Sequence, residues 1–138
     1  MIVNQNIFVE KILPGGIMRP LTDAEMDFYR APYQQIASRK PVWRWPNEIP
    51  IAGEPADVVG IVNDYNAKLQ QSDLPKLLFT VNPGVLLPAP IVAWCQQHLK
   101  NLTIVDLGAG LHFVQEDLVQ EDHPHEIGTA LAKWYQAL

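Results

Sequence analysis

The sequence predicts an α/β fold built on a parallel sheet. Two short apolar runs, residues 74–81 and 102–107, have the length and composition of strands, and a helical pattern follows each of them. The order strand, helix, strand, helix is typical of parallel α/β architecture. The chain has 138 residues, of which 48% are hydrophobic and 18% charged, which suits one ordered domain with its own core.

The first half of the chain carries helical signals. Residues 2–13 have apolar spacing that favours a helix, which Pro14-Gly15-Gly16 ends. Thr22 and Glu25 then form a capping pattern for a short helix that stops near Arg30. Residues 31–53 hold four prolines among large aromatic side chains, which favours an irregular but packed connection.

The second half supplies the elements of the sheet. A helix is expected from Pro55, in its first turn, to Ser72-Asp73, a second over residues 91–98, and a last one over residues 124–138. Two strands cannot complete a parallel sheet, because each strand needs neighbours on its edges and helices on both faces. We therefore expect an exposed apolar edge, with self-association or marginal folding of the chain.

The composition excludes several classes of protein. The net charge of −5 and the scattered lysines and arginines argue against a nucleic-acid partner. The single cysteine, Cys95, excludes an internal disulfide and a thiolate metal cluster, which fits a reducing compartment. The first six residues lack a signal-peptide pattern, and Pro88 and Pro90 interrupt the longest apolar tract. We expect a soluble, cytoplasmic protein without a membrane partner.

One of the four histidines has a position that favours catalysis. His112 follows the second apolar run and its turn at Gly108-Ala109-Gly110, where α/β enzymes place catalytic groups. His98 has the pattern of a surface residue, while His123 and His125 fit a solvated helix entrance better than a metal site. From local pattern alone His112 remains either a general base or a structural histidine.

No motif for a cofactor or a serine nucleophile is present. The sequence lacks a nucleophile elbow, a Walker loop and a dinucleotide fingerprint, so we expect neither cofactor nor metal. Cys95 has no activating base beside it and is interpreted as a small core residue. Val114-Gln115-Glu116-Asp117 recurs as Val119-Gln120-Glu121-Asp122, which we interpret as a tolerated loop duplication.

An ordered set of segments resembles the haloalkane dehalogenases of the α/β-hydrolase superfamily. The most specific is Trp45-Pro46-Asn47-Glu48-Ile49-Pro50-Ile51-Ala52-Gly53-Glu54-Pro55, and Gly110-Leu111-His112-Phe113-Val114-Gln115-Glu116-Asp117 continues the family's order. The resemblance spans nearly the whole chain. The other segments that carry it are residues 8–14, 19–22, 29–32, 75–79 and 83–84.

This resemblance implies the C-terminal part of an α/β-hydrolase fold with part of its helical cap. The cap would occupy residues 1–52 and the core residues 53–138. The family displaces halide from an alkyl halide with an aspartate nucleophile and hydrolyses the resulting ester with a histidine-activated water. His112 matches that base. No position in this sequence corresponds to the family's aspartate nucleophile or to its halide-binding residues. The resemblance therefore implies a detoxifying hydrolase that is present as a fragment and is inactive alone.

The resemblance also implies an apolar pocket for a small halogenated substrate, available once an N-terminal half completes the protein. An apolar, narrow site suits a haloalkane and excludes competing water. Plain core packing is the alternative role for each of these residues. The positions that match the family's pocket are Phe8, Ile12, Gly16, Trp45, Pro46, Ile49, Val85, Leu86 and Phe113.

Departures from the family pattern keep other interpretations open. Asn82 stands at a strand end where some relatives carry an acid, and the second Val-Gln-Glu-Asp copy is foreign to the pattern. One alternative is that the chain is a non-catalytic truncated product, and another is that it is a half-chain that complements a separate N-terminal part. Coelenterazine luciferases share this fold and much of this motif set, so a luciferase-like monooxygenase is a further alternative.

Overall fold

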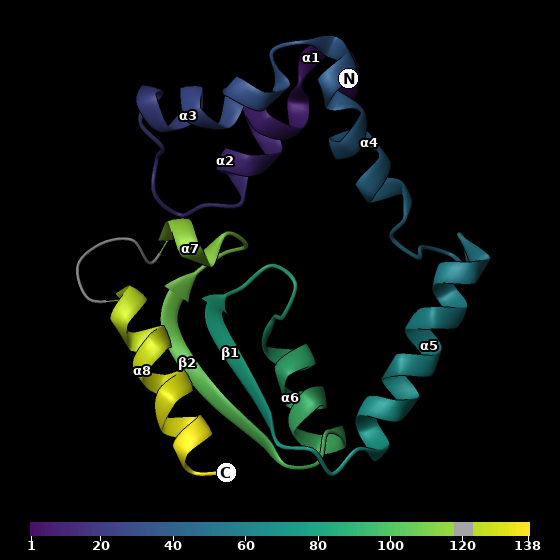
Figure 1. Cartoon of the computed structure of the whole chain (residues 1–138), viewed down its shortest axis with the longest axis vertical. Coiled ribbons are helices and arrows are strands. Elements are labelled where there is room, and N and C mark those ends of the chain that lie inside the picture. Colours follow the sequence, from purple (N-terminus) through teal and green to yellow (C-terminus); the bar gives the residue numbers. More distant parts are fainter. Residues whose placement is uncertain (118–122) are drawn as a thin grey trace. The chain divides into compact units, whose positions relative to one another are not determined.

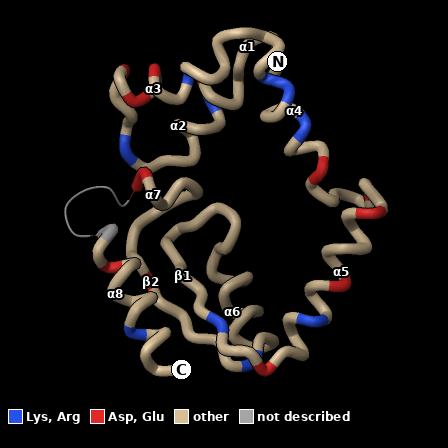
Figure 2. Tube along the Cα trace, viewed as in Figure 1, with Lys and Arg blue, Asp and Glu red and all other residues tan. Residues whose placement is uncertain are grey.

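The structure, a computed structural model, describes residues 1–117 and 123–138 (Figure 1). The described chain divides into two compact units. The first comprises Met1–Gly15 and Pro20–Ala67, and the second comprises Gly16–Arg19 and Lys68–Leu138. The division of the sequence at residue 52 between cap and core stays a prediction. Charged residues of both signs are distributed along the sequence of both units (Figure 2).

The first unit is helical. Its buried apolar side chains are Val9, Leu13 and Met26, which come from three different elements. The elements are α1 (Ile2–Gln5), the π-helical turn η1 (Phe8–Ile12), α2 (Leu13–Gly15), α3 (Asp23–Arg30), the 3-10 turns η2 (Ala31–Tyr33) and η3 (Ile36–Arg39), α4 (Lys40–Asn47), and most of α5 (Ala56–Gln71).

Helix α3 begins as the sequence predicts. The Glu25 backbone N–H donates to Thr22 Oγ1 (3.3 Å), and the Glu25 carboxylate accepts from the Thr22 backbone N–H (2.7 Å). This reciprocal capping box satisfies two amides that the first turn would leave without partners. At its other end, Arg30 pairs with Glu10 (2.9 Å), and the guanidinium lowers the pKa of the Glu10 carboxyl.

The predicted irregular connection over residues 31–53 is largely wrong. Most of it is helical, because Pro32 and Pro41 stand in the first turns of η2 and α4, where the missing proline N–H costs nothing. Arg39 fixes the segment by donating from Nε to the Tyr33 carbonyl (2.7 Å) and from Nη1 to the Val3 carbonyl (3.0 Å). Its aromatic residues do not pack as expected, since Trp43 is 45% and Trp45 79% exposed.

The second unit contains a parallel sheet of strands β1 (Lys76–Pro83) and β2 (Leu102–Gly110). Helix α6 (Ala89–His98) connects the strands and contacts β1, and α8 (His123–Gln136) contacts β2 (Figure 1). The short helix α7 (Val114–Asp117) follows β2. The predicted α/β class and its order of strands and helices are confirmed.

Strand β2 is longer than the sequence suggests. Gly108-Ala109-Gly110 continues the strand instead of forming the expected turn, and its pairing with β1 shifts register between Thr80 and Asn82. Gly110 tolerates no side chain there, because an added Cβ would lie 2.9 Å from the Val81 Cβ. The sequence predicts buried strands, but β1 is only half-buried from Lys76 to Val81, since among the described residues each strand has one neighbouring strand instead of two.

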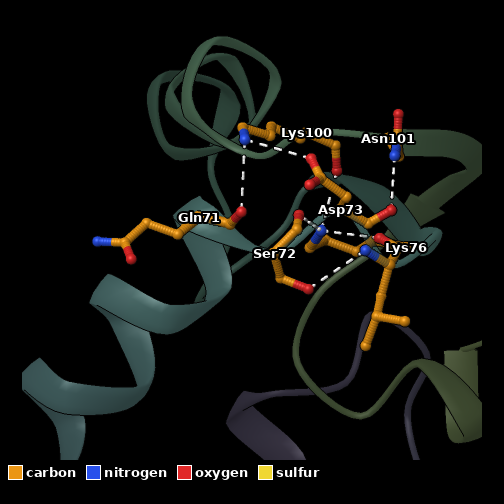
Figure 3. Close-up of polar contacts among 7 residues, drawn as sticks. Gln71, Ser72, Asp73, Lys76, Lys100 and Asn101 are labelled. Carbon is orange, nitrogen blue, oxygen red and sulfur yellow. Dashed lines mark hydrogen bonds and ion pairs between the residues drawn. The ribbon is translucent and has the colours of Figure 1, made fainter.

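A network of polar contacts joins the amino ends of β1 and β2 (Figure 3). Lys76 Nζ donates to the carbonyls of Ser72 (2.8 Å), Leu74 (2.8 Å) and Lys100 (3.0 Å). Asn101 Nδ2 donates to the Asp73 carbonyl (2.6 Å). These bonds fix the chain at the sheet end opposite to His112, which follows the carboxyl end of β2.

Large apolar side chains remain exposed in the described chain. Helix α5 has the predicted bounds, yet Ile61 and Tyr65 of its apolar stripe are 63% and 52% exposed. On α8, Leu131 and Tyr135 are 47% and 72% exposed. Among residues 1–117 and 123–138, no large side chain is completely buried and no helix is long and apolar enough to cross a membrane.

Candidate active site around His112

His112 lies just beyond the carboxyl end of β2, with an exposed side chain. Its backbone is held by a second segment from far along the chain. The carbonyl of Gly16 accepts the N–H groups of both His112 (3.0 Å) and Phe113 (3.2 Å). The Phe113 ring meets the imidazole edge-on, with ring centroids 4.6 Å apart. The exposed imidazole therefore projects from a fixed backbone.

Gly16 permits this close approach because it has no side chain. A Cβ at Gly16 would lie 3.0 Å from two carbon atoms of the Phe113 ring and 3.3 Å from the His112 Cβ. The predicted site residues Gly16 and Phe113 are thus brought directly against His112. Any larger residue at position 16 would displace the aromatic ring.

An apolar pocket of about 200 Å³ lies beside His112 within the second unit. It is formed by the carboxyl-terminal half of β1, the loop after this strand and the residues around His112, and it includes the predicted Val85 and Leu86. Gly84 shapes this loop with φ +63°, and its N–H donates to the Gly110 carbonyl (3.1 Å). The lining residues are Phe79, Thr80, Val81, Gly84, Val85, Leu86, Leu87, Leu111, His112 and Val114.

The other predicted pocket residues belong to the first unit. Trp45 and Ile49 are 79% and 56% exposed, Ile12 is 49% exposed, and Phe8 and Pro46 are half-buried. The predicted set therefore divides into four residues around His112 and five in the helical unit. A shared substrate pocket of all nine stays a prediction.

Comparison with known proteins shows which proteins this chain is similar to. No family model matches the chain. A haloalkane dehalogenase from Bradyrhizobium diazoefficiens is 46% identical over 134 residues, which are 97% of this chain and 42% of that protein. The structure of an ancestral haloalkane dehalogenase superposes with a TM-score of 0.86 at 47% identity, covering 97% of this chain and 45% of that one. This chain is homologous to haloalkane dehalogenases.

Further relatives give the same result and define its extent. The structure of the haloalkane dehalogenase DbeA from Bradyrhizobium elkani has a TM-score of 0.88 and 41% identity over the whole of this chain and 47% of its own. The chain spans under half the length of the haloalkane dehalogenases it matches. The prediction of part of an α/β-hydrolase fold is confirmed.

The remaining titratable candidates among the described residues are His98, His125 and Cys95. His98 is exposed, stacks on Trp94 with centroids 4.5 Å apart, and bonds through Nδ1 to the Trp94 carbonyl (2.8 Å). His125 is exposed on α8, and Cys95 is half-buried on α6. The His123 side chain and the second Val-Gln-Glu-Asp copy, Val119–Asp122 by number, lie outside the described residues. In the described ranges no group of His, Cys, Asp and Glu has the arrangement of a metal site.

Sequence reasoning missed the polar contacts between residues 114–117 and a segment about one hundred positions earlier in the chain. The first Val-Gln-Glu-Asp copy is not a plain loop, because it forms α7 and both of its acids bind the segment Gly16–Arg19, which we call the strap. Arg19 Nη2 pairs with Glu116 Oε2 (3.0 Å), and the Met18 N–H donates to Asp117 Oδ1. A signal was available, since Arg19 and residues 110–117 both belong to segments that resemble the family.

Proposed function

We propose that this chain is the base-bearing part of a haloalkane dehalogenase, which cleaves a carbon–halogen bond to give an alcohol and halide. The observation that carries the proposal is the similarity of nearly the whole chain to haloalkane dehalogenases at 41–47% identity. The position of His112 supports it. An exposed imidazole at the carboxyl end of a strand, beside an apolar pocket, can accept a proton from water.

In the proposed reaction, a carboxylate nucleophile attacks the carbon that carries the halogen. The carbon–halogen bond breaks, halide leaves with its electron pair, and an alkyl ester of the carboxylate forms. His112 then takes a proton from a water molecule while the water oxygen attacks the ester carbonyl. Collapse of the tetrahedral intermediate expels the alkoxide, which takes the proton of the imidazolium and leaves as the alcohol. The carboxylic acid left behind releases its remaining proton to water and becomes the carboxylate again.

We further propose that the nucleophile lies in the part of the protein that this chain does not match. The relatives are more than twice as long as the matched segment. The free edges of the two-stranded sheet and the exposed apolar faces of α5 and α8 support the need for a complement. The chain alone therefore performs no catalytic turnover.

The substrate class follows from the character of the pocket. Valine, leucine and phenylalanine side chains dominate the lining beside His112, which favours a small apolar haloalkane over a charged or sugar-like molecule. In the complete enzyme, an apolar wall would also keep bulk water from the alkyl halide.

The test supplies the missing part. The segment of the Bradyrhizobium diazoefficiens relative that this chain does not match is fused to the chain or co-expressed with it, and bromide release from 1-bromobutane is measured. We expect bromide from the combined protein and none from either part alone. A folded combined protein that releases no bromide would show that the chain is a non-catalytic product, and multiple turnovers by the isolated chain would refute the location of the nucleophile.

A further inference from the structure

The three backbone amides from Leu111 to Phe113 each have a specific acceptor. The N–H groups of His112 and Phe113 donate to the Gly16 carbonyl, and the N–H of Leu111 donates to Asp117 Oδ2 (2.7 Å). Three consecutive amides are therefore bound, two of them by the strap and one by α7. A segment with three consecutive amides engaged has little backbone freedom around the histidine.

Asp117 is the side chain that joins these two supports. Its Oδ1 accepts the Met18 N–H of the strap, while its Oδ2 accepts the Leu111 N–H next to the histidine. Met18 and Asp117 are 99 positions apart in the sequence, so this contact closes a long loop. The carboxylate fixes the strap and the His112 loop relative to each other within the second unit.

We propose that Asp117 is a positioning residue for His112, which sets the direction of the imidazole by holding Leu111 and the strap at once. This inference rests on the proposed role of His112 as the base. Asp117 acts only through the backbone and does not touch the imidazole. Its expected effect is therefore on the placement of the base and not on substrate binding.

Only a carboxylate suits this position. Two backbone N–H groups point at two different oxygens, and a carboxylate offers an acceptor to each of them. Asparagine has nearly the same shape, but its NH2 group is a donor and would face one of the two N–H groups. We call the two hydrogen bonds that Asp117 accepts from Met18 and Leu111 the clamp. Asp117→Asn therefore breaks one of these two bonds with almost no change in side-chain volume.

The neighbouring Glu116 provides a matched control. It lies on the same short helix, carries the same charge, and binds the strap through Arg19 (3.0 Å). Arg19 Nε also donates to the Glu116 backbone carbonyl (2.8 Å), and that bond survives a change of side chain. Glu116→Gln removes the same charge while leaving the bond to Leu111 in place.

The experiment compares Asp117→Asn and Glu116→Gln in the combined protein defined above. For Asp117→Asn we expect kcat for bromide release to fall about tenfold or more with KM within about twofold, because a displaced base slows the reaction without changing the pocket. In NMR spectra the His112 ring signals should shift in Asp117→Asn, since the ring moves relative to Phe113. Glu116→Gln should leave kcat and those ring signals close to the wild-type values.

The outcomes separate this inference from the proposed function. If His112→Ala abolishes turnover but folded Asp117→Asn keeps wild-type kcat and ring signals, the positioning role is refuted and the base survives. If His112→Ala keeps full turnover, the proposed function itself fails. Should Asp117→Asn not fold, amide hydrogen exchange of the wild-type chain decides: slow exchange at both Met18 and Leu111 supports the clamp, and rapid exchange at either overturns it.

Discussion

Replacing Lys76 with methionine tests how the two strands are held together. The Lys76 ammonium uses its three N–H groups for three backbone carbonyls, from Ser72, Leu74 and Lys100 (Figure 3). These carbonyls come from the connection after α5 and from the turn before β2. One cation therefore joins both segments that lead into the sheet, and methionine keeps most of its length without the charge.

The expected loss of stability follows from the exposure of these bonds. The bond to Ser72 is partly buried, so its unpaired carbonyl would cost about 1 kcal/mol or more. The bonds to Leu74 and Lys100 are exposed, and water replaces them at about 0.5 kcal/mol each. Lys76→Met should therefore lower the free energy of unfolding by about 2 kcal/mol, measured by urea denaturation followed through tryptophan fluorescence.

Lys100→Met is the matched control. Lys100 Nζ reaches the Asp73 carboxylate at 3.2 Å and the Gln71 carbonyl at 3.4 Å, and its side chain is 56% exposed. An exposed pair of this kind contributes about 0.5 kcal/mol or less. Equal losses in Lys76→Met and Lys100→Met, or no loss in Lys76→Met, would refute the assignment of the Lys76 bonds as the main connection.

Two further predictions concern the first unit. Thr22→Ala should lower the free energy of unfolding by about 1 kcal/mol, because it removes the acceptor of the Glu25 amide, and an unchanged urea midpoint would contradict this. Arg30 lowers the pKa of Glu10, so the pair stabilises the fold above the unfolded pKa and loses this contribution as the pH falls through the folded pKa. With both side chains about one third exposed, the loss stays under about 1 kcal/mol, and Glu10→Gln should remove that part of the pH dependence.

The parts of the fold that follow from local sequence were predictable. The capping box at Thr22, the bounds of α5 and the alternation of strands and helices all depend on residues within a few positions of one another. The sequence does not predict helix α4, for a local reason as well: the prolines of residues 31–53 favour irregular structure, whereas Pro41 stands in the first turn of a helix.

The parts that depend on distant residues were not predictable from pattern. The strap binds α7 across nearly one hundred positions, and no periodicity connects Met18 with Asp117 or Arg19 with Glu116. Burial was overestimated for a related reason. Trp45 is a large aromatic residue of a kind often found in protein cores. Its burial depends on which other residues cover it, and in the described chain it is 79% exposed.

The candidate site was predictable partly from the position of residues relative to the strands and partly from resemblance to a known family. Position after a strand singled out His112, while its role as a base and the choice of Gly16 and Phe113 came from resemblance to the family. The structure brings those three residues into contact through the Gly16 carbonyl. Asp117 and Glu116 were quoted as part of the motif, yet their bonds to the strap became visible only in three dimensions.

The central claim is that His112 activates water for the second step of dehalogenation. A burst measurement of bromide release tests it most directly, with His112→Ala in the combined protein and 1-bromobutane in excess. The first step needs no base, so the variant should release about one bromide per protein molecule and then stop, while the wild type continues. Continued turnover by His112→Ala at the wild-type rate would contradict the assignment of His112 as the base.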